Sequence, residues 1–445
     1  MTGGRRRLAA VALAALLVLS GCSVGAPLEG GERGDPASDQ LGWENGYWYD
    51  DSLSVTLDDG LNETERRRVV ARTMARVERI RDLEFESRVP VEVITREQYR
   101  EQRSGNGSDS RSAFNRWNNQ VWEAIFIVDE DAHVSETLDS VFSSSVQGYY
   151  SPSKDEIVVV SGTETPTIDR ATLSHELTHA LQDQHFGLGA SRDTQDGQLA
   201  ADGLVEGDAN YVEAAYERRC REGQWSCLDR PERGGGGGGG TFNRGLFTTV
   251  YAPYAAGPGY IDELRSRGGW DAVDAAYDQY PTSTEQVIHP ERYPDDEPAR
   301  VTLPDRSGAD WRRFDVDPVY DTVGEASIYA MFWANGQLED HAHYNYSHPL
   351  STGWDGDRVV PYRNGDEYGY VWRTVWDSPA EAREFAEGYR TLLRSHDAEA
   401  RGDGVYVVPE SDPYADAFHV SRSGDTVTVV NAPTVGQLDA VHALR

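Results

Sequence analysis

The sequence predicts an α+β protein, in which a small sheet lies beside the helices of a candidate site and a smaller α+β unit follows. Two observations lead to this fold class. Between residues 43 and 350, long stretches with helical spacing of apolar side chains alternate with short runs typical of strands. From residue 351 onward, strand-like runs dominate around two helical segments, so a second domain is predicted over residues 351–445.

The first 42 residues are predicted to precede the folded domains. Three arginines at 5–7 lead into an apolar run at 8–19, which suits an export signal and is too short to span a membrane. The Leu-Ser-Gly before Cys22 resembles a lipobox, so residues 1–21 are predicted to be a lipoprotein signal peptide and Cys22 the lipidated residue. An ordinary secretory signal with an incidental cysteine is the alternative. Residues 22–42, rich in Gly, Pro, Asp and Ser, are predicted to form a flexible stalk.

The composition is strongly acidic. The formal net charge is −33, with 75 acidic against 42 basic residues, so binding to nucleic acid, which needs clustered Lys and Arg, is not expected. With 11 Trp and 23 Tyr the chain has enough aromatic residues to bury a core, which argues against disorder. An acidic excess with Lys154 as the single lysine indicates a protein that works in high salt, where screening weakens self-repulsion.

Several elements lead up to the candidate site. Helices are predicted at residues 62–85 and 113–126, and a strand at residues 89–95. Residues 146–150 and 156–161 are predicted to form a hairpin around a Ser-Pro-Ser-Lys-Asp turn.

The most informative motif is the pentapeptide His175-Glu176-Leu177-Thr178-His179. On a helix the two histidines lie about 40° apart around the axis, so both imidazoles can reach one metal ion, and Glu176 faces the same cleft. This helix is predicted to begin at Thr165-Pro166 and to end at Gly187, with an apolar stripe on its buried side. A histidine pair that binds no metal is the alternative.

A zinc site needs a third protein ligand and leaves the fourth position open for water. Glu206 is the favoured ligand, because a second predicted helix at about 197–219 can carry it beside the first. His185 is the other candidate, six residues after His179. It would face away from the metal if its helix continues past Gln182.

These residues resemble the gluzincin class of zinc metallopeptidases, to which thermolysin belongs. Asp183 stands where those enzymes also carry Asp, whereas Asn210 stands where they have an Asp that orients a ligand histidine. An Asn oxygen could accept that hydrogen bond more weakly. The context from Gln147-Gly148-Tyr149-Tyr150 to residues 204–209 is similar to a family of lipid-anchored haloarchaeal surface proteins with a neutral zinc peptidase-like domain.

The resemblance covers residues 60–300 and implies a zincin-like fold for the predicted domain at 43–350. It implies an extracellular, zinc-dependent endopeptidase on the outer face of the cell membrane, held by its lipid, with a protein or peptide as substrate. In this function one Zn²⁺ binds His175, His179 and Glu206. A catalytically inactive zinc-binding surface or adhesion module is the alternative.

Two further roles are assigned within this hypothesis. Glu176 is the general base toward water and later returns the proton to the leaving amine. His289 is the candidate donor to the tetrahedral oxyanion, with Tyr293 as a second candidate in the same polar loop. For each of these two residues, the alternative is a purely structural role in a Pro-flanked loop.

Local sequence patterns also predict the structure of the remaining segments. Cys220 and Cys227 flank a six-residue loop and are predicted to form a disulfide, since export permits oxidation. A glycine run lies in a predicted flexible insertion at 220–241, and helical spacing returns at 257–279. The predicted C-terminal elements are strands at 370–376, 404–408, 417–421 and 426–430, and helices at 379–395 and 435–444.

Overall fold

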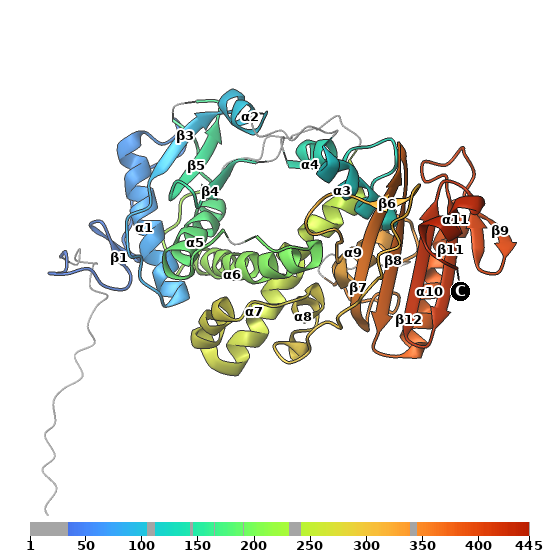
Figure 1. Ribbon diagram of the computed structural model, residues 1–445. Helices are drawn as coiled ribbons and strands as arrows, with labels where there is room; N and C mark the ends of the chain where they lie inside the picture. The colour runs from blue at the N-terminus through green and yellow to red at the C-terminus, as the bar shows by residue number, and fades with distance from the viewer. Residues whose placement is uncertain are drawn as a thin grey trace, which may run out of the picture. The chain divides into compact units, whose positions relative to one another are not determined.

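Two sheets, of three and seven strands, and a set of long helices make up most of this α+β protein, shown as a computed structural model in Figure 1. The short strands β1 (Trp43–Glu44) and β2 (Tyr47–Trp48) form a further two-stranded sheet. The structure describes residues 34–104, 112–142, 146–163, 165–189, 191–230, 242–338 and 345–444. The predicted signal peptide, Cys22, most of the predicted stalk and the glycine run lie outside the described residues. In the described chain, no helix has both the length and the apolar character needed to cross a membrane.

The smaller sheet has three strands in the order β3-β5-β4. The predicted hairpin is present, with β4 (Gly148–Ser151) antiparallel to β5 (Glu156–Ser161). On its other side β5 runs parallel to β3 (Val91–Thr95), so β4 is an edge strand. The buried Ile-Val-Val-Val run of β5 suits a central strand that is covered on both faces.

Helix α1 (Glu63–Arg81) and helix α5 (Arg170–Phe186) pack together beside this sheet (Figure 1). α1 begins at a capping box, in which the side chain of Asn62 accepts two backbone N–H groups and Glu65 bonds back to Asn62. It ends at Asp82, earlier than predicted, because Asp82 adopts the left-handed conformation with φ 59°.

The predicted start of α5 at Thr165-Pro166 is wrong. Asp169 is the N-cap, because its carboxylate accepts the N–H groups of Ala171 and Thr172. The predicted end is confirmed, since Gly187 has a φ of 72° and stops the helix.

Helix α6 (Gln195–Arg221) packs against α5 on one side and against α7 (Arg244–Asp278) on the other. The contact with α7 is very close at two glycines. A Cβ atom added to Gly207 would lie 2.6 Å from the backbone of Gly257, and one at Gly257 would lie 2.4 Å from the carbonyl oxygen of Gly203. Only residues without side chains allow this approach, which brings the α7 segment before Gly257 next to Glu206.

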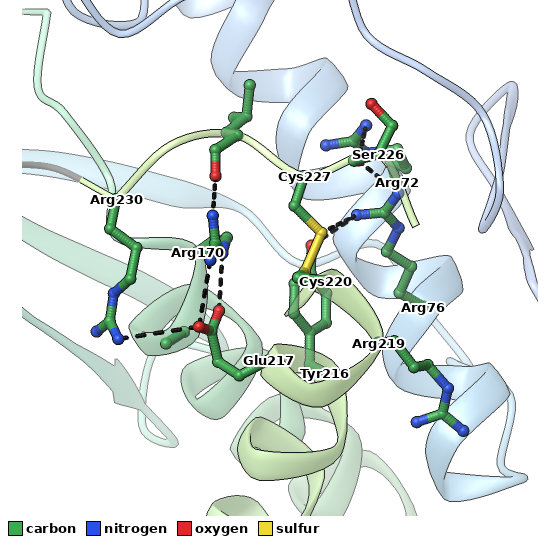
Figure 2. Close-up of a disulfide and its surroundings, with 12 residues drawn as sticks. Arg72, Arg76, Arg170, Tyr216, Glu217, Arg219, Cys220, Ser226, Cys227 and Arg230 are labelled. Carbon is green, nitrogen blue, oxygen red and sulfur yellow. Dashed lines mark hydrogen bonds and ion pairs between the residues drawn. A yellow bond between two sulfur atoms is a disulfide. The ribbon is translucent and has the colours of Figure 1, made fainter. Parts of the chain in front are cut away.

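The predicted disulfide between Cys220 and Cys227 is present at the end of α6 (Figure 2). Arg76 of α1 donates to the carbonyl oxygen of Ser226 at 2.9 Å and lies 3.6 Å from Cys227 Sγ. Arg72 donates to the same carbonyl oxygen at 3.1 Å. The cystine loop is therefore fastened to α1.

The larger sheet has seven antiparallel strands in the order β6-β7-β8-β12-β11-β10-β9. In β8 the side chains of Tyr370 and Trp372 face a core shared with α10, whereas Val371 belongs to a core shared with α11. The sheet is thus covered on both faces. Its strands are β6 (Arg312–Arg313), β7 (Trp354–Asn364), β8 (Glu367–Trp376), β9 (Glu399–Gly402), β10 (Val405–Val407), β11 (Ala417–Ser423) and β12 (Thr426–Ala432).

Two helices that precede strand β7 in the chain also join the core of this sheet. Trp117 and Val121 of α3 (Ala113–Ala124) and Ile328 of α9 (Gly324–Ala334) lie in the same hydrophobic cluster as Trp372. The other elements are α2 (Arg96–Ser104), α4 (Val134–Phe142), α8 (Thr284–Ile288), a 3₁₀ turn at Pro290–Arg292, α10 (Pro379–Ser395) and α11 (Val435–Val441).

Candidate metal centre

The packing of α5 against α6 brings the three predicted metal ligands together. His175 Nε2 lies 3.1 Å from Glu206 Oε2 and 3.0 Å from His179 Nε2. His179 Nε2 lies 3.4 Å from Glu206 Oε2, which closes the triangle. The two histidine side chains are about one-tenth exposed and Glu206 is 18% exposed, so the triangle is largely shielded from solvent.

The size of this triangle fits a zinc ion. A tetrahedral zinc ion with bonds of about 2.0–2.1 Å separates neighbouring ligand atoms by roughly 3.3 Å. The donor set of two imidazoles and one carboxylate is the set found in catalytic zinc sites. The residues present therefore fit zinc in number, chemistry and spacing.

The charges of the cluster also favour a cation. Burial by itself lowers the pKa of His175, but the carboxylates of Glu206 and Glu213 outweigh it and raise the pKa to about 10. Burial by itself raises the pKa of Glu206, but the imidazoles of His179 and His175 outweigh it and hold the pKa well below its usual range. The negative field that retains protons on the imidazoles attracts a divalent cation in the same way, so metal and protons compete.

Glu176 lies between this cluster and the small sheet. Its Oε2 accepts the backbone N–H of Tyr150 at 2.8 Å, from the edge strand β4. Burial raises the pKa of Glu176, although the two imidazoles and this N–H oppose the shift. A carboxylate with a raised pKa beside a metal site is suited to take up and release a proton near neutral pH.

Gln182 orients the second histidine, a role that the sequence pattern does not indicate. Its Oε1 lies 2.9 Å from His179 Nδ1, and its Nε2 donates to the carbonyl oxygen of Val205 at 2.9 Å. The bond to Val205 fixes the amide with its oxygen toward the ring. Nδ1 of His179 must then carry the proton, which leaves Nε2 free to bind a metal.

The first histidine faces Glu213, not the predicted Asn210. Glu213 Oε2 lies 3.4 Å from His175 Nδ1, a buried nitrogen with no well-aligned hydrogen bond among the described residues. Glu213 lies about one helical turn beyond Asn210 on α6. Rotation of the helix thus brings a carboxylate to the position where an amide was expected.

Tyr254 of α7 completes the site and was not among the predicted residues. Its ring stacks on His175 at 6.4 Å with an interplanar angle of 13°. Desolvation of the hydroxyl group, followed by the charge of Glu206 and a hydrogen bond to it, raises the pKa of Tyr254 far above its usual range, although part of the ring is exposed. The hydroxyl group therefore stays protonated and can donate a hydrogen bond beside the metal ligands.

A row of aromatic rings extends from Tyr254 along α7. Tyr251 stacks on Tyr254 at 5.8 Å, Phe247 stacks on Tyr251 at 5.3 Å, and Phe242 lies 5.1 Å from Phe247. Phe242, Phe247 and Tyr254 are 56%, 37% and 36% exposed, which is high for such rings. We call these four residues the aromatic row.

Three other candidates lie away from the cluster. His185 Nε2 lies 2.7 Å from the carbonyl oxygen of Glu84, because α5 continues unbroken past Gln182 and turns this ring away. His289 Nε2 lies 3.1 Å from the buried Glu325 of α9. The hydroxyl of Tyr293 donates to the carbonyl oxygen of Gln279. The structure thus gives neither His289 nor Tyr293 a contact with the three ligands among the described residues.

Comparison with known proteins yields one family match. Residues 312–442 match a domain of unknown function, DUF8575. No curated protein matches the chain. The family match runs from β6 to the end of α11 and so covers the seven-stranded sheet, whereas the candidate metal centre lies before it in the chain.

Proposed function

We propose that this protein is a zinc-dependent endopeptidase with a zincin-like domain, in which His175, His179 and Glu206 hold one zinc ion. The observation that carries the proposal is the triangle of their donor atoms, with sides of 3.0, 3.1 and 3.4 Å. Glu176, on the same helix as the two histidines and half-buried, supplies the base that a purely structural site would not need.

When bound, zinc supplies Lewis acidity, which polarises a carbonyl oxygen and makes water more acidic. Glu176 takes a proton from the water whose oxygen forms the new bond to the peptide carbonyl carbon. It then gives that proton to the amide nitrogen as the carbon–nitrogen bond breaks. The backbone N–H of Tyr150, 2.8 Å from Glu176 Oε2, holds the carboxylate in place for both transfers.

Tyr254 is the donor that we assign to the oxyanion, in preference to His289. A donor to the tetrahedral oxyanion must lie beside the metal ligands, and Tyr254 stacks on His175 and is hydrogen-bonded to Glu206. His289 is instead engaged with Glu325. Because its pKa is raised, Tyr254 keeps its proton at the pH of the reaction.

The aromatic row is the surface that we assign to the substrate. It leads from Tyr254 at the candidate metal centre through the stacked rings of Tyr251 and Phe247 to the exposed ring of Phe242, which is tilted against Phe247. Exposed apolar surface of this kind marks a binding site, and flat rings suit the apolar and aromatic side chains of an unfolded polypeptide. The proposed substrate is thus a protein segment with such side chains.

The location belongs to the same proposal. Lipidation of Cys22 would tether the enzyme to the outer face of the membrane. There the salt of the surrounding medium would screen the repulsion between its acidic side chains.

The experiment that tests the function compares the wild-type chain with Glu176→Gln, both expressed and assayed in molar NaCl. We expect both proteins to hold one zinc per chain, and only the wild type to hydrolyse casein, with a loss of at least 10³-fold in the variant. Zinc without hydrolysis in the wild type would support the inactive binding module. Equal hydrolysis by both proteins would disprove the role of Glu176.

A further inference from the structure

A second group of carboxylates lies where α3 meets the seven-stranded sheet. Glu123 stands at the end of α3, Glu130 lies in the loop after it, and Asp416 directly precedes β11. One carboxylate oxygen from each residue lies within 4.8 Å of the other two. Glu123 and Asp416 are 4% and 6% exposed, whereas Glu130 is exposed at the rim.

No basic side chain offsets these charges. The charged groups that act on Glu123 are Asp416, Glu130 and Asp129, all of them acidic. Burial and the charge of Glu130 raise the pKa of Asp416 to about 8. In the part of the chain that the structure describes, none of the three forms an ion pair with Lys, Arg or His. Buried carboxylates in this situation need either shared protons or a metal cation.

Two buried amide groups at the same place distinguish these possibilities. Gln120 Nε2 donates to Glu123 Oε2 at 2.5 Å, and Asn431 Nδ2 donates to Asp416 Oδ2 at 2.8 Å. Gln120 is 6% exposed and Asn431 is fully buried. The carbonyl oxygen of each amide is buried and has no hydrogen-bond partner among the described residues. A proton on one carboxyl group can serve at most one of these oxygens, whereas a single cation can take both of them as ligands.

We propose that Glu123, Glu130 and Asp416 bind one Ca²⁺ ion, with the amide oxygens of Gln120 and Asn431 as neutral ligands. Ca²⁺ takes six to eight oxygen ligands at about 2.3–2.6 Å in flexible geometry, so two of its ligands lie at most roughly 5 Å apart. Mg²⁺ demands a smaller octahedron and keeps several waters, which a buried site accommodates poorly. A ligand set made only of oxygen also disfavours zinc.

The ion would hold the segment after α3 against the sheet. Phe126 in this segment has a φ of 51° and packs its ring against Tyr389, Tyr414 and Phe418. Ca²⁺ would join the same segment, through Glu123 and Glu130, to β11 and β12. The inference concerns stability, and it stands whether or not the metal centre hydrolyses peptides.

The test is thermal unfolding of the zinc-loaded chain in molar NaCl after removal of calcium, with CaCl₂ or MgCl₂ then added. For the wild type and for Glu136→Gln, an exposed carboxylate outside the cluster, we expect Ca²⁺ at 100 times its Kd to raise Tm by roughly 3–5 °C. Mg²⁺ at the same concentration should produce less than half of this shift. In Asp416→Asn the shift with Ca²⁺ should disappear.

Glu130→Gln provides a second variant, since its carboxylate lies at the rim and its loss leaves no buried charge. We expect it to fold as the wild type does and to need at least tenfold more Ca²⁺ for the same shift. A wild type that does not respond to Ca²⁺ would overturn the proposal, as would an Asp416→Asn protein that responds fully. A cluster held by shared protons would give a third result, in which only lower pH stabilises the wild type, and this also overturns it.

Discussion

Gln182 Oε1 lies 2.9 Å from Nδ1 of His179, while the amide nitrogen of the same side chain donates to the backbone of α6. One residue thus links the helix that carries two candidate metal ligands to the helix that carries the third. The orientation of His179 and the spacing of α5 and α6 are therefore coupled.

Gln182→Leu should lower zinc affinity about 10–100-fold, because the imidazole loses the acceptor that fixes its tautomer. Gln182→Glu retains an acceptor and should recover much of the affinity. Gln184→Leu is the matched control, since Gln184 is two residues away and its described hydrogen bonds go to Glu86 and Ser87, away from the metal centre. Competition with a zinc-binding dye measures all three. Equal affinity in Gln182→Leu and Gln184→Leu would show that Gln182 does not orient the ligand.

Glu206→Ala should lose zinc during dialysis against a mild chelator, whereas His185→Ala should retain it. Glu206 reaches both imidazoles from α6, while His185 faces the carbonyl oxygen of Glu84 on the other side of α5. Zinc content per chain is the measurement, at one salt concentration for both variants. The reverse pattern would mean that α5 breaks in solution and that His185 is the third ligand.

Tyr254→Phe should lower kcat about 10²–10³-fold with little change in KM, because it removes only the hydroxyl that donates to the oxyanion. Zinc content should stay at one per chain. Tyr320→Phe, which lies away from the centre, serves as the control. An unchanged kcat in Tyr254→Phe would show that the Tyr254 hydroxyl does not donate to the oxyanion.

Phe247→Ala should raise KM for protein substrates and leave kcat nearly unchanged, since the rings of Tyr251 and Tyr254 separate Phe247 from the candidate ligands. Short peptides that do not reach Phe247 should be cleaved at the wild-type rate. A loss in kcat for both kinds of substrate would instead indicate that Phe247 supports Tyr254 structurally.

Arg81→Met should destabilise the fold by about 3–5 kcal/mol, because it leaves the fully buried Asp208 of α6 without its cation. The Arg81 guanidinium lies 3.0 Å from Asp208 and also binds Asp274, so it joins α1 to α6 and α7. Arg67→Met removes an exposed ion pair with Glu63 and should change stability little. Denaturant unfolding compares the two, and a similar small effect in both would show that the buried pair is not required.

Cys22→Ser should release the protein from membranes or leave it unprocessed, since lipidation needs the sulfur atom. Fractionation of cells that express each form is the measurement. A processed variant that stays with the membrane would disprove the lipid anchor.

Local pattern alone predicted the elements whose signals lie within a few residues. The helix expected at residues 379–395 is found at Pro379–Ser395, and the hairpin β4–β5 forms as expected. Strand β7 was not predicted, and it contains Pro361, which cannot donate to a neighbouring strand. Pro361 is tolerated there because the outer partners of β7 pair with other residues: β6 pairs with Tyr362 and Arg363, and Asp321 forms a bridge with Val359.

For the candidate site, the sequence by itself indicated the candidate ligands His175 and His179, because helical spacing places both on one face, and it offered Glu206 from a second predicted helix. Only the tertiary structure decided what surrounds them. Tyr254 reaches Glu206 because α6 and α7 approach closely at their glycines, and Gln182 reaches Val205 because α5 lies beside α6. These contacts depend on how separate helices pack, a relationship that no spacing along the chain encodes.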